Sequence, residues 1–170
     1  MSVLIIAGSS RTESLNGKLQ QRIANVAQAN GRPCYVYPAT ELDAPIYNGD
    51  DEQANGVPSN IQKLASAIND ATKVVIVTPE YNSSIPPLLK NAIDWTTRLE
   101  HNPWVGKTVL LAGAAPGRLG AMRAMTHLMV IMAAVKSWVA PMFLSCAQAS
   151  DETIAGFDSD QIQGFLKQGD

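Results

Sequence analysis

The sequence predicts a three-layer α/β domain built on a parallel sheet, and three observations lead to that fold class. Short, continuous apolar runs alternate with segments of helical periodicity along the whole chain, which is the pattern of repeated βαβ units. The runs are not broken by polar residues at every second position, as expected for strands covered on both faces. The chain has 170 residues, 46% of them hydrophobic, which fits one domain, 1–170, with a sizeable core.

The first half of the chain holds three of the expected strands and two helices. A continuous apolar strand, Val3–Ala7, precedes a helix that begins after Ser14 as N-cap and carries apolar residues at helical spacing. The weaker strand Cys34–Tyr37 comes next, followed by an amphipathic helix around residues 61–68. Val74–Val77 is the strongest strand because all four residues are β-branched.

The second half alternates three helices with two strands. A helix is expected over residues 86–98, because the Pro-Pro pair that opens it is tolerated in a first turn and not later. The strands Thr108–Ala112 and Val139–Leu144 flank a long helix at 119–135, and a short helix capped by Asp158 ends the series. Five strands in alternation with five helices predict right-handed crossovers between parallel strands.

Three loops that follow strands are the expected ligand region, because open parallel sheets bind ligands beyond the carboxyl ends of their strands. The loop 8–16 offers hydroxyls, an amide and Arg11 at a helix N-terminus, which favours phosphate binding. The alternative is a capped loop whose arginine is only solvated. The loop 78–87 has three prolines and an aromatic that could frame a flat ligand or only form a turn. The loop 113–120 has small residues that allow close backbone approach, or merely the turn itself. The Asp- and Asn-rich stretch 41–56 is the one long loop expected.

Composition and missing motifs argue against several classes of protein. The formal net charge is −2 and no run of basic residues is present, which argues against a nucleic-acid partner. No Walker, three-glycine, nucleophile-elbow, HExxH or Cys-x-x-Cys pattern occurs, and both histidines lie outside the three loops. A site with no metal, nucleophile or placed acid and base favours a bound cofactor that carries the chemistry.

Compartment and membrane association follow from the apolar residues and the cysteines. The longest strongly apolar stretch, Leu128–Val135, is too short to cross a membrane, so a cytoplasmic chain with no membrane partner is expected. Cys34 and Cys146 are expected to be free, packed thiols rather than a disulfide or a metal site.

Three stretches match the motifs of one known family. The opening loop is similar to a Gly-Ser-x-Arg-x-x-Ser-x-Asn phosphate motif, and Leu42–Tyr47 is similar to an Asp-x-Pro loop. The most specific match is Thr78–Asn82 followed by Ser84–Pro86 and Leu89–Trp95. Over nearly its whole length the chain therefore resembles the NADPH-dependent FMN reductases, which include quinone, chromate and azo-dye reductases. The resemblance implies a flavodoxin-like three-layer sandwich with a five-stranded parallel sheet in the order 2-1-3-4-5.

The same resemblance implies FMN as cofactor and NAD(P)H as co-substrate, and it assigns residues to the flavin. The phosphate would be held by Ser9, Arg11, Ser14, Leu15 and Asn16; the isoalloxazine would be lined by Pro79, Glu80, Tyr81 and Asn82; its pyrimidine end would meet Ala115 and Gly117. Many family members carry serine at the position of Ala115, so only backbone contact is expected there. No side chain is expected to be catalytic, because the flavin carries the chemistry, and no metal is expected.

The implied reaction is transfer of hydride from NAD(P)H through bound FMN to a quinone-like or other small acceptor, in two half-reactions. Two alternatives stay open: a flavodoxin-type electron carrier, which Arg11 and the modest charge disfavour, and a low-turnover flavin-binding regulatory protein, which Ala115 favours. The preference between NADH and NADPH and the physiological acceptor cannot be read from the residues.

The helix expected at 119–135 also predicts self-association. Only Arg123, Thr126 and His127 are clearly polar in it, and four of its residues are methionine. A helix that is apolar nearly all round needs cover on two sides. The sheet supplies one cover and a second subunit, with the helix of Trp95, is expected to supply the other. Family members form dimers and tetramers, so a homodimer or homotetramer is expected.

Overall fold

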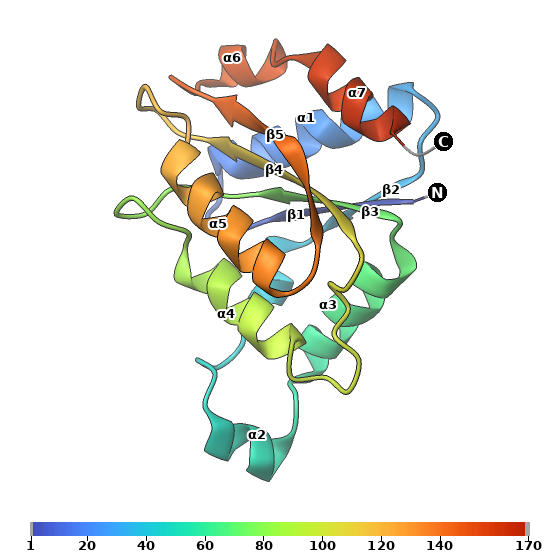
Figure 1. Cartoon of the computed structure of the whole chain (residues 1–170). Helices are drawn as coiled ribbons and strands as arrows, with labels where there is room; N and C mark the ends of the chain where they lie inside the picture. The colour runs from blue at the N-terminus through green and yellow to red at the C-terminus, as the bar shows by residue number, and fades with distance from the viewer. Residues whose placement is uncertain (1, 169–170) are drawn as a thin grey trace.

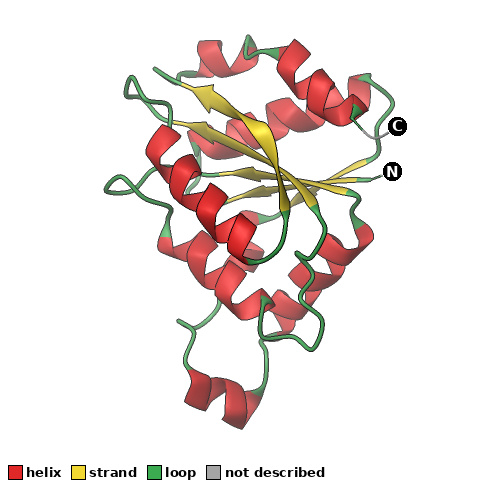
Figure 2. Cartoon of the chain, viewed as in Figure 1, coloured by secondary structure: helices red, strands yellow, loops and turns green. Residues whose placement is uncertain are grey.

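The computed structural model describes residues 2–168 and contains a five-stranded sheet between two layers of helices (Figures 1 and 2). The sheet order is β2-β1-β3-β4-β5, and every neighbouring pair is parallel. The order 2-1-3-4-5 is confirmed. The strands are β1 (Val3–Ala7), β2 (Cys34–Tyr37), β3 (Lys73–Val77), β4 (Thr108–Ala114) and β5 (Trp138–Cys146).

The helices cover both faces of the sheet and divide the core in two. One face packs against α1 (Leu15–Ala29), α6 (Asp151–Ala155) and α7 (Ser159–Lys167). The other packs against α3 (Ser59–Asp70), α4 (Pro87–Thr96) and α5 (Met122–Ala134). Side chains of β1 alternate between the two cores, with Leu4 and Ile6 in one and Val3 and Ile5 in the other. This double cover explains why the central strands read as unbroken apolar runs.

The long loop expected at 41–56 contains secondary structure that the pattern did not indicate. A 3₁₀ turn at Ala39–Leu42 overlaps its start, and α2 (Gly49–Asn55) lies within it, projecting from the body in Figure 1. No residue of α2 is buried, so it has no apolar stripe that could have revealed a helix. The short α6 was missed for a related reason: it has one buried residue, Ile154, and begins at a capping box between Ser150 and Thr153.

The helix expected from residue 119 begins three residues later, at Met122. Gly120 and Ala121 have φ values of 52° and 64°, a left-handed conformation that no α-helix continues through. From Met122 onward, Ala124, Met125, Leu128 and Met132 face the sheet and are fully buried. The expected first turn is therefore part of the loop that closes the site.

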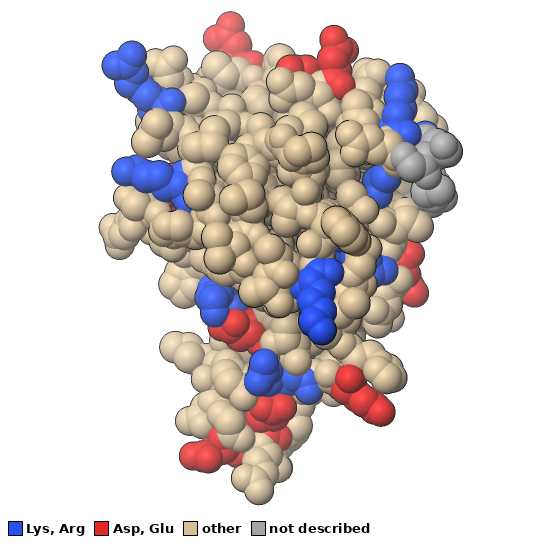
Figure 3. Space-filling model, in the orientation of Figure 1, with Lys and Arg blue, Asp and Glu red and all other residues tan. Residues whose placement is uncertain are grey.

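The opposite side of α5 is exposed and carries apolar residues beside Arg123, Thr126 and His127. Met122, Met129 and Val130 are exposed there, and Leu119 and Trp138 add to the same kind of surface. In Figure 3 the charged side chains lie mostly around the margin of the face that carries α5 and β5. Within residues 2–168, no helix is both long and apolar enough to cross a membrane.

The two cysteines occupy opposite edges of the sheet. Cys34 lies on β2 and Cys146 on β5, the two outer strands, and both thiols are free. Cys146 is buried as expected, whereas Cys34 is only partly buried. Burial raises the pKa of both thiols above the ordinary value, which makes them less reactive.

Candidate functional site

The three expected loops meet at the carboxyl ends of β1, β3 and β4 around a cavity of about 200 Å³. Its lining comes from all three loops and comprises Ser9, Arg11, Ser14, Leu15, Asn16, Pro79, Glu80, Tyr81, Ala114, Ala115 and Pro116. Asn82 and Gly117 do not line it, so their contact with the cofactor stays a prediction. A second cavity of about 370 Å³ shares Ser9, Arg11 and Ser14 with the first and continues along α1 past Lys18. The two cavities therefore adjoin at these three residues, and we call the 200 Å³ cavity the trough.

The phosphate-type loop is polar and keeps donors available. The hydroxyl of Ser14 caps α1 by accepting a hydrogen bond from the amide of Gly17 at 3.4 Å. The amides of Leu15 and Asn16 are in the first turn of α1, where N–H groups have no carbonyl of their own helix. Arg11 is exposed, and its guanidinium makes one long hydrogen bond, 3.4 Å to the carbonyl of Glu13.

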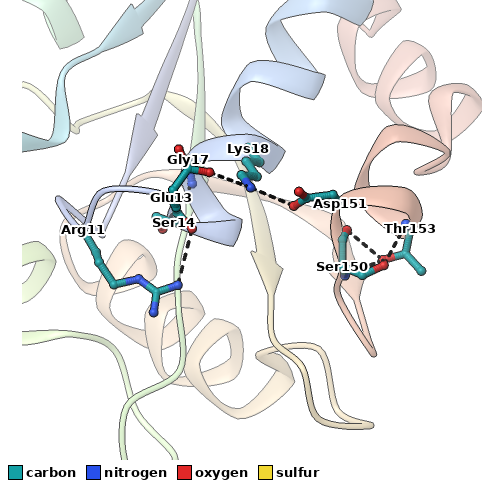
Figure 4. A network of polar contacts seen from close by, with 8 residues as sticks. All are labelled: Arg11, Glu13, Ser14, Gly17, Lys18, Ser150, Asp151 and Thr153. Atoms are coloured by element: carbon teal, nitrogen blue, oxygen red, sulfur yellow. Dashed lines mark hydrogen bonds and ion pairs between the residues drawn. The ribbon is translucent and has the colours of Figure 1, made fainter.

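The acidic residue of this loop, Glu13, takes part in an ion-pair bridge (Figure 4). The ammonium of Lys18 lies 2.9 Å from the carboxylate of Glu13 and 2.8 Å from that of Asp151, in the first turn of α6. Hydrogen bonds to Asp151 and then to Glu13 raise the pKa of Lys18 above its ordinary value. The Lys18 ammonium therefore offsets part of the negative charge that Glu13 and Asp151 place near the N-terminus of α1.

The side chain of Asn16 is already used within the protein. It is 4% exposed, its Nδ2 donates to the carbonyl of Ala114 at 3.0 Å, and its Oδ1 accepts from the amide of Ala114 at 2.9 Å. This pair of bonds fixes the first turn of α1 against the end of β4. For Asn16, phosphate binding stays a prediction that concerns its backbone amide alone.

The second loop contains a tight hairpin that presents Tyr81. The amide of Tyr81 donates to the carbonyl of Ser84 at 2.9 Å, and the amide of Ser84 returns a bond of 3.0 Å. Asn82 and Ser83 between them have φ values of 49° and 65°, as a two-residue type I′ turn requires. The Tyr81 side chain stays half-exposed at the cavity. Asn82 is at the tip of the turn, which explains why it does not line the cavity.

The carboxylate of Glu80 is hydrogen-bonded to the start of α5. Its oxygens accept from the Arg123 guanidinium (Nε at 2.7 Å) and from the amides of Arg123 and Ala124 at 3.1 and 3.4 Å. These amides are in the first turn of α5, whose N-cap Ala121 has no side-chain acceptor. Burial alone would raise the pKa of Glu80, but the bonds from Arg123 and Ala124 outweigh it and hold the pKa below the ordinary 4.5. Glu80 can therefore meet a ligand mainly through its backbone.

The third loop is packed so closely that two of its positions must be glycine. A Cβ on Gly113 would lie 2.7 Å from both the Ala121 Cβ and the Thr78 carbonyl. A Cβ on Gly120, whose φ is 52°, would lie 2.4 Å from the Ser145 hydroxyl. The small residues of this loop bring the ends of β3, β4 and β5 together.

Both the backbone amide and the backbone carbonyl of Ala115 already make hydrogen bonds. Its amide donates to the carbonyl of Cys146 at 3.2 Å, and its carbonyl accepts from the amide of Ala149 at 3.0 Å. The expected backbone contact with a flavin must therefore share atoms that already bond to the segment after β5. Its role at the pyrimidine end stays a prediction.

The Leu89–Trp95 signature positions the Asp-x-Pro loop. Asn91 Nδ2 donates to the carbonyls of Ala44 and Pro45 at 3.0 Å each, and its Oδ1 accepts from the amide of Tyr47 at 2.9 Å. The indole of Trp95 donates to Pro45 at 2.7 Å and packs edge-on against the Tyr47 ring at 5.0 Å. The signature therefore acts on a neighbouring loop and not on the cavity itself.

Two residues at the site were not anticipated from the sequence. Arg123 binds Glu80, and His127 Nδ1 lies 3.0 Å from the hydroxyl of Ser84, so both hold the second loop to α5. The spacing of four residues between Arg123 and His127 was the available signal in the sequence, since it puts both on one face of a helix.

The trough suits an FMN molecule in both charge and shape. At one end the hydroxyls of Ser9 and Ser14, the first-turn amides of α1 and the Arg11 guanidinium form a donor set for a dianionic phosphate. At the other end Pro79, Tyr81 and the loop of Ala115 form walls for a flat ring. Residues 2–168 contain no group of three or more His, Cys, Asp or Glu that could hold a metal ion.

Comparison with known proteins agrees with this geometry. The profile of the NADPH-dependent FMN reductases matches residues 1–151. The chain is 39% identical over 136 residues to a quinone reductase of Escherichia coli K12, covering 78% of this chain and 69% of that protein. It is 37% identical to a NAD(P)H-dependent FMN reductase of Pseudomonas aeruginosa, covering 75% of this chain and 67% of that one. Among solved structures, the flavoenzyme NAD(P)H:(acceptor) oxidoreductase FerB of Paracoccus denitrificans aligns with a TM-score of 0.77 and 31% identity, covering 97% of this chain and 92% of that one. This protein belongs to the NADPH-dependent FMN reductase family of flavin-dependent oxidoreductases.

Proposed function

We propose that residues 1–170 form one FMN-binding domain that oxidises NAD(P)H and reduces a quinone or similar small acceptor by a two-step (ping-pong) mechanism. The single observation that carries the proposal is the convergence of three post-strand loops on one trough with phosphate donors at one end and flat walls at the other. Bound FMN supplies the ability to accept a hydride from one substrate and deliver it to another. A cytoplasmic location stays a prediction.

The residues of this chain bind and orient the cofactor. Ser9, Ser14 and Arg11 hold the phosphate, and the first-turn amides of Leu15 and Asn16 add donors aligned with the helix dipole. Tyr81 lines the trough with a half-exposed side chain and borders the ring. A ring open on one face can accept the nicotinamide and the acceptor in turn, which supports the proposed two-step mechanism.

Reconstitution with FMN is the first test. The purified protein should bind FMN, acquire the absorption of a flavoprotein and oxidise NAD(P)H faster when a benzoquinone is added. Double-reciprocal plots at several quinone concentrations should be parallel, as a ping-pong mechanism requires. Protein that binds no FMN would remove the proposal. Protein that binds FMN but takes electrons only from a partner reductase would be an electron carrier, and one with negligible turnover would be a regulatory flavin-binding protein.

We further propose that the exposed apolar side of α5 is covered by a second copy of the chain, in a homodimer or homotetramer. Met129 and Val130 are exposed on α5, and Val130 lines a cavity of about 480 Å³ between α4 and α5 together with Ile85, Pro87 and Ile131 among others. Burial of such a surface is favourable in proportion to its apolar area. Light scattering at micromolar concentration tests this, and a monomer there would contradict it.

A further inference from the structure

The Tyr81 hairpin is attached to α5 at two points, one on each side of its turn. Before the turn, Glu80 accepts hydrogen bonds from the side chain and backbone of Arg123. At the end of the turn, the Ser84 hydroxyl lies 3.0 Å from His127 Nδ1. Residues 123 and 127 are four apart, so one turn of α5 presents both attachments on the same face.

The hairpin needs such attachments because its own bonds are few. The two backbone bonds between Tyr81 and Ser84 are its only ladder, and an isolated two-stranded hairpin is marginally stable in water. Its turn places Asn82 and Ser83 in the left-handed region, which side-chain-bearing residues adopt at a cost. The conformation therefore depends on what surrounds it.

The helix on the other side of these attachments is a firm base. Four of its residues, Ala124, Met125, Leu128 and Met132, are 0% exposed in the core between α5 and the sheet. Close packing of that kind leaves the helix little freedom to shift. A side chain of α5 that hydrogen-bonds to the hairpin therefore holds Tyr81 in a fixed position relative to the core.

We propose that His127 is a positioning residue for the flavin site, acting through Ser84 to fix the Tyr81 hairpin at the cavity. This inference rests on the proposed function. His127 does not line the flavin cavity and has no part in the chemistry; it lines the neighbouring cavity between α4 and α5. Its effect is to keep Tyr81 where FMN meets it, so that binding does not have to order the hairpin.

The test uses paired variants of the full-length protein. His127→Leu removes the ring nitrogen, Ser84→Ala removes the hydroxyl, and His127→Asn keeps a hydrogen-bonding atom near the position of Nδ1. Thr126→Ala is the matched control, because Thr126 is exposed on the same helix and bonds only within it, to the Met122 carbonyl. Two quantities are measured: the Kd for FMN by fluorescence titration, and amide hydrogen exchange at Tyr81 and Ser84 in the protein without flavin.

His127→Leu and Ser84→Ala should each weaken FMN binding by about fivefold and speed exchange at the two hairpin amides by a similar factor, since one hydrogen bond is lost. The double variant should be no worse than either single one, because both remove the same bond. His127→Asn should recover most of the affinity, and Thr126→Ala should match the unmodified protein.

The inference is overturned if His127→Leu and Ser84→Ala bind FMN and exchange like the unmodified protein, or if their effects add in the double variant. Failure of His127→Asn to recover affinity would reduce His127 to a packing role. If His127→Leu does not fold, Ser84→Ala still tests the inference, because it removes only one hydroxyl oxygen from a partly buried residue. If the unmodified protein binds no FMN, the proposed function fails, while the exchange measurement still tests the attachment itself.

Discussion

The two ends of the trough are built in opposite ways. At the phosphate end, Arg11 has a single long hydrogen bond of 3.4 Å to its own loop, and the first-turn amides of α1 are unclaimed by the helix. At the ring end, the glycines at 113 and 120 allow backbone segments to pack with no space for a Cβ. The Tyr81 hairpin, at the ring end, is fixed to α5 by Glu80 and Ser84.

The difference reflects what each end has to recognise. A phosphate is small, charged and strongly hydrated, so donors that wait in solvent can exchange water for ligand oxygens. A flat ring gains little from any single hydrogen bond and depends on surfaces that are already in place. The phosphate end therefore keeps hydrogen-bond donors available for a ligand, while the ring end is closely packed and rigid. Four substitutions distinguish the effects of losing donors from the effects of disturbing packing.

The largest effect is expected at Gly113, in the rigid end. Gly113→Ala puts a Cβ 2.7 Å from backbone and side-chain neighbours, which cannot both move away. Overpacking of this kind should cost about 3 kcal/mol and lower Tm by roughly 6–12 °C in thermal unfolding. Gly164→Ala is the control: nothing lies within 4 Å of its added Cβ in α7, so it should stabilise by about 0.5 kcal/mol. Equal Tm values for the two variants would break the contrast.

Asn16 links the two ends, and its loss should be felt in stability. Asn16→Ala leaves the buried amide and carbonyl of Ala114 without their partners. The expected cost is about 2 kcal/mol in urea unfolding with an unchanged m-value. Asn25→Ala, on the exposed side of the same helix, should stay within about 0.5 kcal/mol. A neutral Asn16→Ala would mean that water replaces both bonds.

Substitution of Arg11, at the phosphate end, should change the affinity for FMN and not the stability of the fold. Arg11→Ala should weaken FMN binding about tenfold, by loss of a charge-assisted contact to phosphate, and leave Tm unchanged. Riboflavin, which lacks the phosphate, is the control ligand, and its affinity should not respond to the substitution. An equal loss for both ligands would place Arg11 at the ring instead.

Glu80 gives the smallest effect and a distinct pH dependence. Its pKa in the folded protein is below the ordinary 4.5, so its ionised form favours the folded state. That stability is fully present above pH 4.5 and disappears as the pH falls through the lower folded pKa. Glu80→Gln should therefore be less stable than the unmodified protein by about 1 kcal/mol at neutral pH, as expected for a lost helix cap. The gap should narrow as the pH falls below 4.5, and a gap that is the same in acid as at neutral pH would contradict the assignment.

The sequence predicted the elements that bury an apolar face and missed those that do not. All five strands and the sheet order are confirmed, and the central strands β1, β3 and β4 read as apolar runs because they are covered on both faces. α2 has no buried side chain, and the start of α5 depends on backbone angles at Gly120 and Ala121 that periodicity does not register.

For the site, loops and residue types were predictable but contacts were not. The three loops do meet at one cavity, as strand ends of a parallel sheet must. What the sequence could not reveal is that the side chains of Asn16 and Glu80 turn toward Ala114 and α5. Those choices depend on which backbone groups lie unpaired across 98 and 43 residues of chain.

The three tryptophans give the chain two built-in optical reporters. Trp95 and Trp104 are each 1% exposed, with their indole N–H groups bonded to Pro45 and Thr96, so their emission should shift to the red only when the core opens. Trp138 is 74% exposed on β5 and should already emit as a solvated indole. Iodide quenching therefore reads two events separately: Trp138 reports whether another surface settles over that edge of the sheet, and the buried pair reports unfolding.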